Sequence, residues 1–393
     1  MAAADTTRFG LIFTLWAAGL GAAAQYGKIS VIFEDLGQAY GQSGAALGVV
    51  VSAVGLVGVL FGVMAGIIVT RLTLRRALLG GLILGGVLSL YQATLPSLPL
   101  FIASRVLEGL SHLLIVVATP TLIAQASTVA TRGFTLTLWG SFFGVSFSLL
   151  ILLGLPLVDA FGLPSLFIAH GLYMLAFAAA LWRALPQDTP VITPLTPGAI
   201  ARRHVDVYRS PRKSAAGLGW LFYTFCFVST LTFLPQFLRE DLRVVVSAAM
   251  PIVSIIASLT LGVFLLRFIS AVRVTETAFV FSALCALALL LLPGSAVFAL
   301  LFTMGLGIVQ GASFAVVPEL NADLEDRAQG NGAMAQTGNI GNALGTPVIA
   351  ALLVGLGYSA MMFALMLALV GGLLVHLYCA KRRDRLSPEL AAR

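Results

Sequence analysis

Charged side chains are scarce in this chain of 393 residues, where Asp, Glu, Lys and Arg together make up 10% of the sequence. Soluble globular domains carry about 25% charged residues, so the scarcity excludes an ordinary soluble domain. Cysteine is rarer still, with three residues. Cys226, Cys285 and Cys379 lack the spacing of metal ligands, so we expect them to be packing residues and predict no metal site.

Signatures of catalysis are missing as well. No glycine-rich loop ends in Lys-Ser or Lys-Thr, so nothing supports ATP-driven transport within this chain. No Gly-x-Ser-x-Gly is present and the four histidines are scattered, so a hydrolase triad has no support. We therefore expect a protein that is not an enzyme and that holds no cofactor.

Apolar residues fill the chain instead, at 59% of the sequence with a mean hydropathy of +1.01. They fall into about twelve blocks of about 20 residues, the length at which a helix crosses ~30 Å of hydrocarbon. Helices are expected because backbone polar groups cannot stay unpaired in lipid. The sequence predicts an all-α polytopic membrane protein with spans at 9–33, 44–70, 76–95, 98–126, 132–157, 162–185, 215–238, 244–267, 274–292, 295–320, 329–355 and 358–380.

Lysine and arginine gather in alternate connections between these spans. One set of connections, with the two ends of the chain, holds Arg8, Arg71, Arg75, Arg76, Arg132, Arg202, Arg203, Arg209, Arg212, Lys213, Arg273, Lys381, Arg382, Arg383 and Arg385. The positive-inside rule makes this set cytoplasmic, so both termini are predicted inside. The net charge of +7 reflects this sorting, and no basic face with stacking aromatics indicates nucleic acid.

The amino-terminal segment allows two interpretations. Residues 1–24 resemble a secretory signal peptide, with a basic residue, an apolar run and small residues. The apolar run continues to Phe33 and many spans follow, so a first transmembrane helix is the preferred interpretation.

A proline-rich, basic connection divides the predicted spans six and six. The sequence predicts an amino-terminal half at 1–185, a cytoplasmic linker at 186–214 and a carboxyl-terminal half at 215–393 with a short basic tail. Short matches link the halves. The second and eighth spans end in Gly-x4-Arg, at Gly66 and Gly262, and Glu108-Gly-Leu-Ser parallels Gln310-Gly-Ala-Ser. Such repeats are a common plan of transporters.

Two motifs resemble signatures of the major facilitator superfamily, and the resemblance extends over essentially the whole chain. The loop Gly66-x4-Arg71-x3-Arg75-Arg76 is similar to the family's loop motif, and Arg105-x-x-Glu108-Gly-x-Ser is similar to its fourth-span motif. The resemblance implies twelve helices in two six-helix bundles around a central cavity lined by helices 1, 4, 7 and 10.

The chain departs from the family pattern in all three motifs. In the fourth-span motif Glu108 stands where Gln is usual and Ser111 where the last glycine is usual. Thr70 stands where the loop acid is usual and Thr73 where its second glycine is usual, so the conformational latch of that loop is in question. The exporter signature of the fifth span is weak, because Val145 and Ser146 follow Gly140 and Gly144.

Arg105, Glu108 and His112 form the most distinctive polar cluster, within about 60° of one another on a helix face. Buried charges in a span are costly and normally face a cavity or each other. We predict that Arg105 binds an anionic group of the substrate and that Glu108 or His112 exchanges a proton. The alternative is an Arg105–Glu108 pair that only ties helices together.

Further polar residues within the spans are candidates for substrate binding. They are Gln25 and Lys28 in the first span, Tyr223 in the seventh, Gln310 in the tenth, and Gln336 and Asn339 in the eleventh. For Lys28 the slightly favoured alternative is a side chain that extends to the outer interface. For the two amides of the eleventh span, helix packing is an equal alternative. His170, the lone histidine of the sixth span, is interpreted as a packing residue whose hydrogen bonds are satisfied.

The cytoplasmic end of the tenth span carries Glu319 and the run Asp323, Glu325, Asp326 and Arg327. Solvated loop charges are the default interpretation. A cytoplasmic gate, in which these acids pair with Arg132 or Arg71, is the alternative.

Together these features predict a secondary active transporter for a small polar solute, with an organic anion and proton-coupled uptake preferred. The alternatives are a proton antiporter that exports a drug or metabolite and, from another class, a membrane-embedded enzyme. The expected partners are the solute, protons and membrane lipid, with no nucleic acid. We expect a monomer in a bacterial inner (plasma) membrane.

Overall fold

The computed structural model describes residues 6–41, 45–187, 189–190 and 197–391, and these ranges contain helices without any strand. Within them, eleven helices or runs of helices are long and apolar enough to cross a membrane. Before the linker the elements are α1 (Phe9–Val31), α2 (Phe33–Tyr40), α3 (Ala45–Leu72), α4 (Leu74–Gln92), α5 (Leu98–Ala126), α6 (Val129–Gly140), α7 (Phe142–Leu149), the π-helical turn η1 (Leu150–Gly154), α8 (Leu155–Phe161) and α9 (Leu163–Ala184).

The linker contains α10 (Pro197–Arg209), a helix that the sequence analysis did not anticipate. After it come α11 (Ser214–Phe233), the 3-10 turn η2 (Leu234–Phe237), α12 (Glu240–Ala257), the π-helical turn η3 (Ser258–Gly262), α13 (Val263–Leu265), α14 (Ala271–Leu291), α15 (Ala296–Leu320) and α16 (Leu324–Ala391).

Element α16 is two helices that meet at a break. Gly357 has φ 81° and ψ −171°, which is not a helical conformation. Glycine adopts it readily because it has no side chain to clash. The break falls between the predicted spans 329–355 and 358–380. The stretch Leu324–Arg385, 62 residues long, therefore contains a reversal of the chain rather than one helix.

Two other predicted spans are also subdivided. The span predicted at 132–157 is a chain of short helices from Val129 to Phe161 that includes η1. The span predicted at 244–267 begins at Glu240 and includes η3. Such π-helical turns bend helices locally and are frequent near functional sites.

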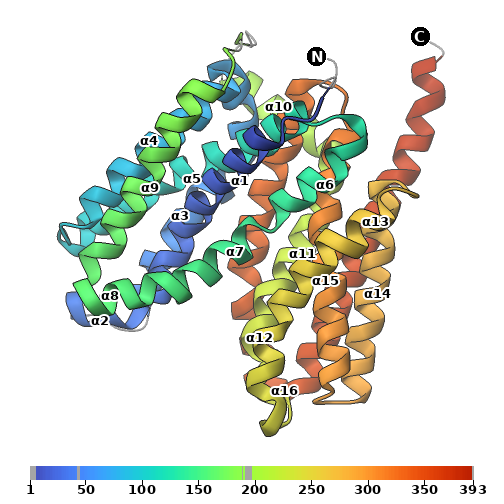
Figure 1. Cartoon of the computed structure of the whole chain (residues 1–393). Helices are drawn as coiled ribbons and strands as arrows, with labels where there is room; N and C mark the ends of the chain where they lie inside the picture. The colour runs from blue at the N-terminus through green and yellow to red at the C-terminus, as the bar shows by residue number, and fades with distance from the viewer. Residues whose placement is uncertain (1–5, 42–44, 188, 191–196, 392–393) are drawn as a thin grey trace.

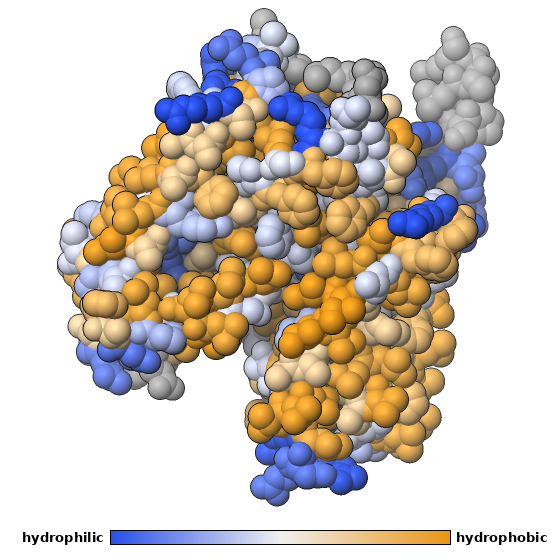
Figure 2. All heavy atoms as spheres, viewed as in Figure 1, coloured by the Kyte–Doolittle hydropathy of each residue, from blue (hydrophilic) through white to orange (hydrophobic). Residues whose placement is uncertain are grey.

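The helices on either side of the linker form two bundles (Figure 1). The bundles meet at the end that holds α10, the start of α1 and the end of α16, which we call the closed end, and they diverge toward α2, α8 and α12. Figure 2 shows a notch between the diverging arms, apolar residues over the sides of both bundles, and hydrophilic residues gathered at the ends. This distribution is typical of a protein that spans a bilayer.

Glycines allow α3 and α16 to approach closely at the closed end. A Cβ atom added at Gly332 would lie 2.5 Å from the carbonyl oxygen of Gly62, and one at Gly66 would lie 2.6 Å from that of Ala328. Small residues permit such contacts between membrane helices, where dispersion forces replace the hydrophobic effect. Gly66, predicted as part of the loop motif, therefore contributes to the contact between the two bundles.

The linker helix α10 packs across this contact. The buried side chain of Val207 lies in one apolar cluster with Val63 of α3 and Ala333 of α16. Tyr208 donates a hydrogen bond of 2.7 Å to Gln336, and burial raises the pKa of Tyr208 to about 12, so its hydroxyl keeps its proton at neutral pH. The linker thus contacts both bundles.

Two ion pairs hold the linker to the start of α16. Arg203 pairs with Glu325 at 2.7 Å and Lys213 with Asp326 at 2.6 Å. The acidic run therefore pairs with the linker and not with Arg132, whose Nε donates to the carbonyl of Ala124 at 3.3 Å. The suggested pairing of the acids with Arg132 is therefore not formed among the described residues, and the pairing with Arg71 stays a prediction. Glu319 instead accepts from the first backbone N–H groups of α14, at Ala271 (2.5 Å) and Val272 (3.3 Å), which stabilises that helix start.

We expect Gly332→Ala to lower the midpoint of thermal unfolding of the purified protein in detergent. The new methyl group must displace backbone, and overpacking of this kind costs about 1–3 kcal/mol. Gly355→Ala is the matched control, because it lies in the same element and has nothing within 4 Å of an added Cβ. Equal midpoints for the two variants would contradict the close contact of α3 with α16.

Candidate functional site: a pocket between the bundles and a buried charge cluster

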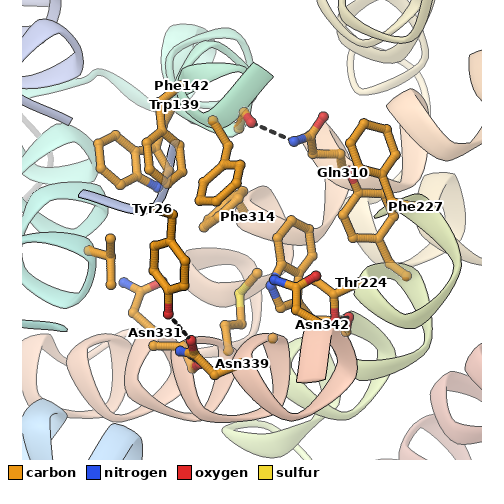
Figure 3. A pocket seen from close by; sticks show the side chains of 18 of the residues that line it. Tyr26, Trp139, Phe142, Thr224, Phe227, Gln310, Phe314, Asn331, Asn339 and Asn342 are labelled. Atoms are coloured by element: carbon orange, nitrogen blue, oxygen red, sulfur yellow. Dashed lines mark hydrogen bonds between the residues drawn. The ribbon is translucent and has the colours of Figure 1, made fainter. Parts of the chain in front are cut away.

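A pocket of about 830 Å³, including the part open to solvent, lies between the two bundles. Both contribute to its wall (Figure 3). Residues before the linker are Tyr26, His112, Val116, Trp139, Gly140, Phe142 and Phe143. Residues after it are Trp220, Tyr223, Thr224, Phe227, Val228, Gln310, Phe314, Asn331, Met334, Ala335, Gly338, Asn339 and Asn342.

The wall combines aromatic rings with side-chain amides. Among the described residues it contains no Asp, Glu, Lys or Arg. Rings from α6, α11 and α15 lie close together, and Trp220 contacts Phe314 and Tyr223 with ring centroids 5.0 and 4.5 Å apart. Such a wall can pack against the apolar parts of a solute while the amides supply both donors and acceptors.

Hydrogen bonds between the bundles cross the pocket. Tyr26 donates to Asn339 Oδ1 at 2.5 Å, and Gln310 Nε2 donates to the carbonyl of Gly140 at 2.7 Å (Figure 3). Separation of the bundles at this level would break both bonds. The predicted residues Gln310 and Asn339 therefore lie in the pocket and at the same time join its two walls.

Tyr223 is one of three pocket residues, with Trp139 and Asn331, that have a buried polar atom without a hydrogen-bond partner in the described structure. Its side chain is buried, and its hydroxyl has no partner within the described structure. A buried hydroxyl without a partner costs free energy comparable to a lost hydrogen bond. A bound solute that accepts from this hydroxyl would remove that cost.

A second group of polar residues lies outside the pocket wall, inside the amino-terminal bundle. Lys28 of α1 and Glu108 of α5 form an ion pair of 2.6 Å, and Arg105 Nη1 binds the other carboxylate oxygen of Glu108. All three side chains are fully buried. We call these three residues the charge cluster.

Neighbouring helices complete the hydrogen bonding of the charge cluster. Gln92 of α4 donates to Glu108 Oε2 at 2.9 Å. Arg105 also donates to the carbonyls of Gln25 (2.8 Å) and Val50 (3.1 Å), which ties α5 to α1 and α3. Buried charges are tolerated when they are paired in this way.

His112 connects the charge cluster to the pocket. It lies one helical turn after Glu108, and its Nδ1 is 2.9 Å from the carbonyl oxygen of Ala22. Its ring meets Tyr26 edge to face, with centroids 4.9 Å apart. His112 is thus the member of the predicted Arg105–Glu108–His112 set that reaches the pocket.

The structure separates the predicted substrate-binding residues into three places. Tyr223, Gln310 and Asn339 line the pocket. Lys28 and Arg105 form the charge cluster, and Gln25, beside it, donates to Ser111 at 2.7 Å. Gln336 is in neither place, because its amide binds Tyr208 and the carbonyl of Val59 at the closed end.

The interpretation of Lys28 needs correction. Lys28 does not extend to the outer interface, since its ammonium is fully buried and paired with Glu108. His170 is buried with its ring nitrogens satisfied, as expected: its Nδ1 lies 2.9 Å from Ser89 Oγ and 3.3 Å from Lys28 Nζ, and its Nε2 lies 2.9 Å from the carbonyl of Gly21. The contact of Lys28 with Glu108 and His170 was missed because the sequence does not show which distant helices pack together.

Several site residues escaped the sequence analysis. Asn331 precedes Asn339 by eight residues, a spacing that puts both amides on one helix face and so indicates a shared wall. Gln92 and Ser89 share a face of α4 in the same way. For Tyr26, Trp139 and Phe314 no local signal distinguishes a pocket ring from a packing ring.

The residues of the loop motif hold the turn between α3 and α4. Thr70 is buried, and its hydroxyl donates to the carbonyl of Ile67 at 3.0 Å. Thr73 has φ 84°, the conformation that favours the glycine usual in the family, and its hydroxyl accepts from Arg76 N–H at 3.2 Å.

The arginines of this motif lie at the surface of the closed end. Arg75 donates to the carbonyl of Trp182 at 2.7 Å and lies over that ring at 4.9 Å. Arg71 and Arg76 are exposed. Arg75 thereby joins α4 to α9 within one bundle.

Comparisons with solved structures show the same fold in known transporters. FucP, a fucose:proton symporter of E. coli, in an outward conformation, shares 13% identity over 94% of this chain and 98% of its own, with a TM-score of 0.73. The human organic anion transporter MFSD10 shares 17% identity over 93% of this chain and 98% of its own, with a TM-score of 0.74. The proton:xylose symporter XylE, bound to 6-bromo-6-deoxy-D-glucose, shares 13% over 95% of each chain, with a TM-score of 0.72.

At these identities the likeness concerns the fold alone. A search of curated protein sequences found no match. The family model described as Major Facilitator Superfamily, by contrast, matches residues 12–346, from within α1 to within α16. Because this match covers most of the sequence, the chain belongs to the Major Facilitator Superfamily of membrane transporters.

Proposed function

We propose that this protein is a proton-coupled secondary transporter that moves a small polar solute by alternating access. The observation that carries the proposal is a pocket walled by both bundles and closed at one end by α3, α16 and α10. Membership of a transporter family sets aside the membrane-embedded enzyme. We assign residues 1–185 to one bundle and residues 215–393 to the other. The chain then crosses the membrane twelve times if the two helices of α16, on either side of Gly357, each cross it once.

The orientation follows from the basic residues. The linker carries Arg203 and Lys213, and the first turn of α4 carries Arg75, all at the closed end. If this end is cytoplasmic, as the positive-inside rule requires, both termini are inside and the pocket faces outward. Rocking of the bundles would then break the α3–α16 contact and open the pocket to the cytoplasm.

We propose a small organic anion as the solute. The pocket wall has no charge among its described residues, but the charge cluster behind it contains two cations and one carboxylate. A surplus positive charge in a medium of low dielectric acts over several ångströms and favours an anion in the pocket. Arg105, predicted as a direct ligand, contributes in this account through its charge, because its guanidinium is held by Glu108.

The second candidate is an antiporter that exports a drug or metabolite. It is favoured by the aromatic rings of the pocket wall, which suit an apolar solute. In both cases we assign proton coupling to the charge cluster and His112, which include the two carriers named from the sequence, Glu108 and His112.

A thermal-shift screen followed by vesicle uptake tests the function. The probes are lactate, benzoate, gluconate, glucose, glutamate and tetraphenylphosphonium. An anion at about 100 times its dissociation constant should stabilise the protein by about 2.7 kcal/mol and should accumulate in proteoliposomes under an inward pH gradient. If tetraphenylphosphonium alone stabilises the protein and the vesicles export that cation, the proposal of anion uptake is refuted and the antiporter takes its place.

We expect Tyr223→Phe to weaken binding of the solute that the screen identifies by about 5- to 10-fold, because one hydrogen bond contributes about 1 kcal/mol. The matched control is Tyr358→Phe, in the same bundle, whose hydroxyl donates to the carbonyl of Leu289 at 2.8 Å outside the pocket. Isothermal titration of both variants gives the comparison. Equal affinities would remove Tyr223 from the binding site.

We expect Glu108→Gln to destabilise the fold by about 3–5 kcal/mol, because it leaves two buried cations without a counter-charge. Adding Lys28→Met should recover part of the loss, since one of those cations is then gone. Glu276→Gln is the control: Glu276 also pairs with an arginine three residues before it, but the Arg273 side chain is 70% exposed, so the loss should stay below about 1 kcal/mol. Thermal unfolding in detergent ranks the three variants. If Glu108→Gln/Lys28→Met is less stable than Glu108→Gln, the account of two buried cations that share one carboxylate is contradicted.

A further inference from the structure

The ammonium of Lys28 has three hydrogen-bond partners, one for each of its N–H groups. They are Glu108 Oε1 at 2.6 Å, Ser89 Oγ at 3.0 Å and His170 Nδ1 at 3.3 Å. The Nε2 of His170 lies 2.9 Å from the carbonyl oxygen of Gly21. Because a carbonyl only accepts, Nε2 carries the proton, and Nδ1 of the neutral ring is free to accept from Lys28.

The groups around Lys28 do not balance its charge. Helix α5 presents Arg105 and Glu108, α9 presents His170, and α4 presents the uncharged Ser89. With His170 neutral, two cations face one carboxylate, so the buried group carries a net charge of +1. Burying an uncompensated charge is costly, and the Nη2 of Arg105 has no partner in the described structure.

The net charge of this buried group indicates which of its members can release or take up a proton with the smallest cost in free energy. Arg105 does not deprotonate in proteins. A proton added to Glu108 or His170 would raise the net charge to +2, and Glu108 would also lose acceptor capacity that Lys28, Arg105 and Gln92 use. Loss of a proton from Lys28 leaves a neutral group with the Arg105–Glu108 pair intact.

We propose that Lys28 carries the coupled proton of this transporter. The inference rests on the proposed function, because it names the proton carrier of that same transport cycle. Protonated Lys28 gives the cluster its surplus charge, and an anion in the pocket balances it. Linkage then makes the effect reciprocal: the anion favours protonated Lys28 by the same factor by which protonated Lys28 favours the anion.

The position of Lys28 connects this charge to the pocket. It lies two residues after Tyr26 on α1, and Tyr26 binds Asn339 of α16 across the pocket. A change of charge at Lys28 therefore occurs within one helical turn of a hydrogen bond that joins the bundles. Both the solute and the movement of the bundles are within reach of its electrostatic effect.

The protonation of Lys28 can be measured directly because the chain has only three lysines, Lys28, Lys213 and Lys381. Lys213→Arg/Lys381→Arg leaves Lys28 alone without a change in the cluster. The double variant, labelled with ¹³C- and ¹⁵N-lysine and purified in detergent, gives one ε-methylene NMR signal to follow with pH. Wild-type protein supplies Lys213 and Lys381 as internal references.

We expect the ε-methylene signal of Lys28 to change with pH separately from the signals of Lys213 and Lys381. A Lys28 signal that stays with those of Lys213 and Lys381 throughout would overturn the proposal. The measurement needs no solute, so its result is independent of whether the vesicle screen finds transport.

Lys28→Arg provides the second test, since arginine keeps the charge but does not release it. For any probe of the screen that wild-type vesicles accumulate, this variant should exchange the probe across the membrane but lose its accumulation under a pH gradient. Wild-type accumulation by Lys28→Arg would overturn Lys28 as the carrier while leaving the transport function in place. Wild-type vesicles that accumulate no probe would instead refute the proposed function.

Discussion

The carboxylate of Glu108 is the group on which the amino-terminal bundle depends. It accepts from Lys28 of α1, Gln92 of α4 and Arg105 of its own helix, all in a fully buried environment. Arg105 extends the network to backbone carbonyls of α1 and α3. Separation of any of these helices would expose a charge to lipid, so the network holds the bundle to one arrangement.

The pocket, in contrast, depends on how the two bundles meet. Glycines of α3 and α16 bring the backbones together at the closed end, and Val207 of α10 packs across the same contact. Arg203 and Lys213 of the linker also pair with acids at the start of α16. The family's loop acid is replaced by Thr70, whose hydroxyl is used inside its own helix. We infer that contacts of the linker contribute the stabilisation of the closed end that the loop acid cannot supply here.

The separation of charge from the pocket wall has a chemical consequence. A charged side chain in direct contact would bind an anion strongly in every state of the transporter. A charge placed behind Tyr26 and His112 acts through its field. If Lys28 carries the coupled proton, as we propose, the affinity of the pocket follows the protonation of the cluster.

The sequence alone determined the membrane class, the position of most spans and the family, because long apolar blocks, basic connections and short motifs are local signals. It also identified Arg105, Glu108 and His112 as one helix face, since helical spacing is local too. It did not reveal that Lys28 pairs with Glu108 and contacts His170, or that Gln336 binds the linker and not the pocket. The residues in those contacts lie 80 to 142 positions apart in the sequence. Only tertiary packing decides them, because it sets which helix faces meet and therefore which buried charge finds a partner.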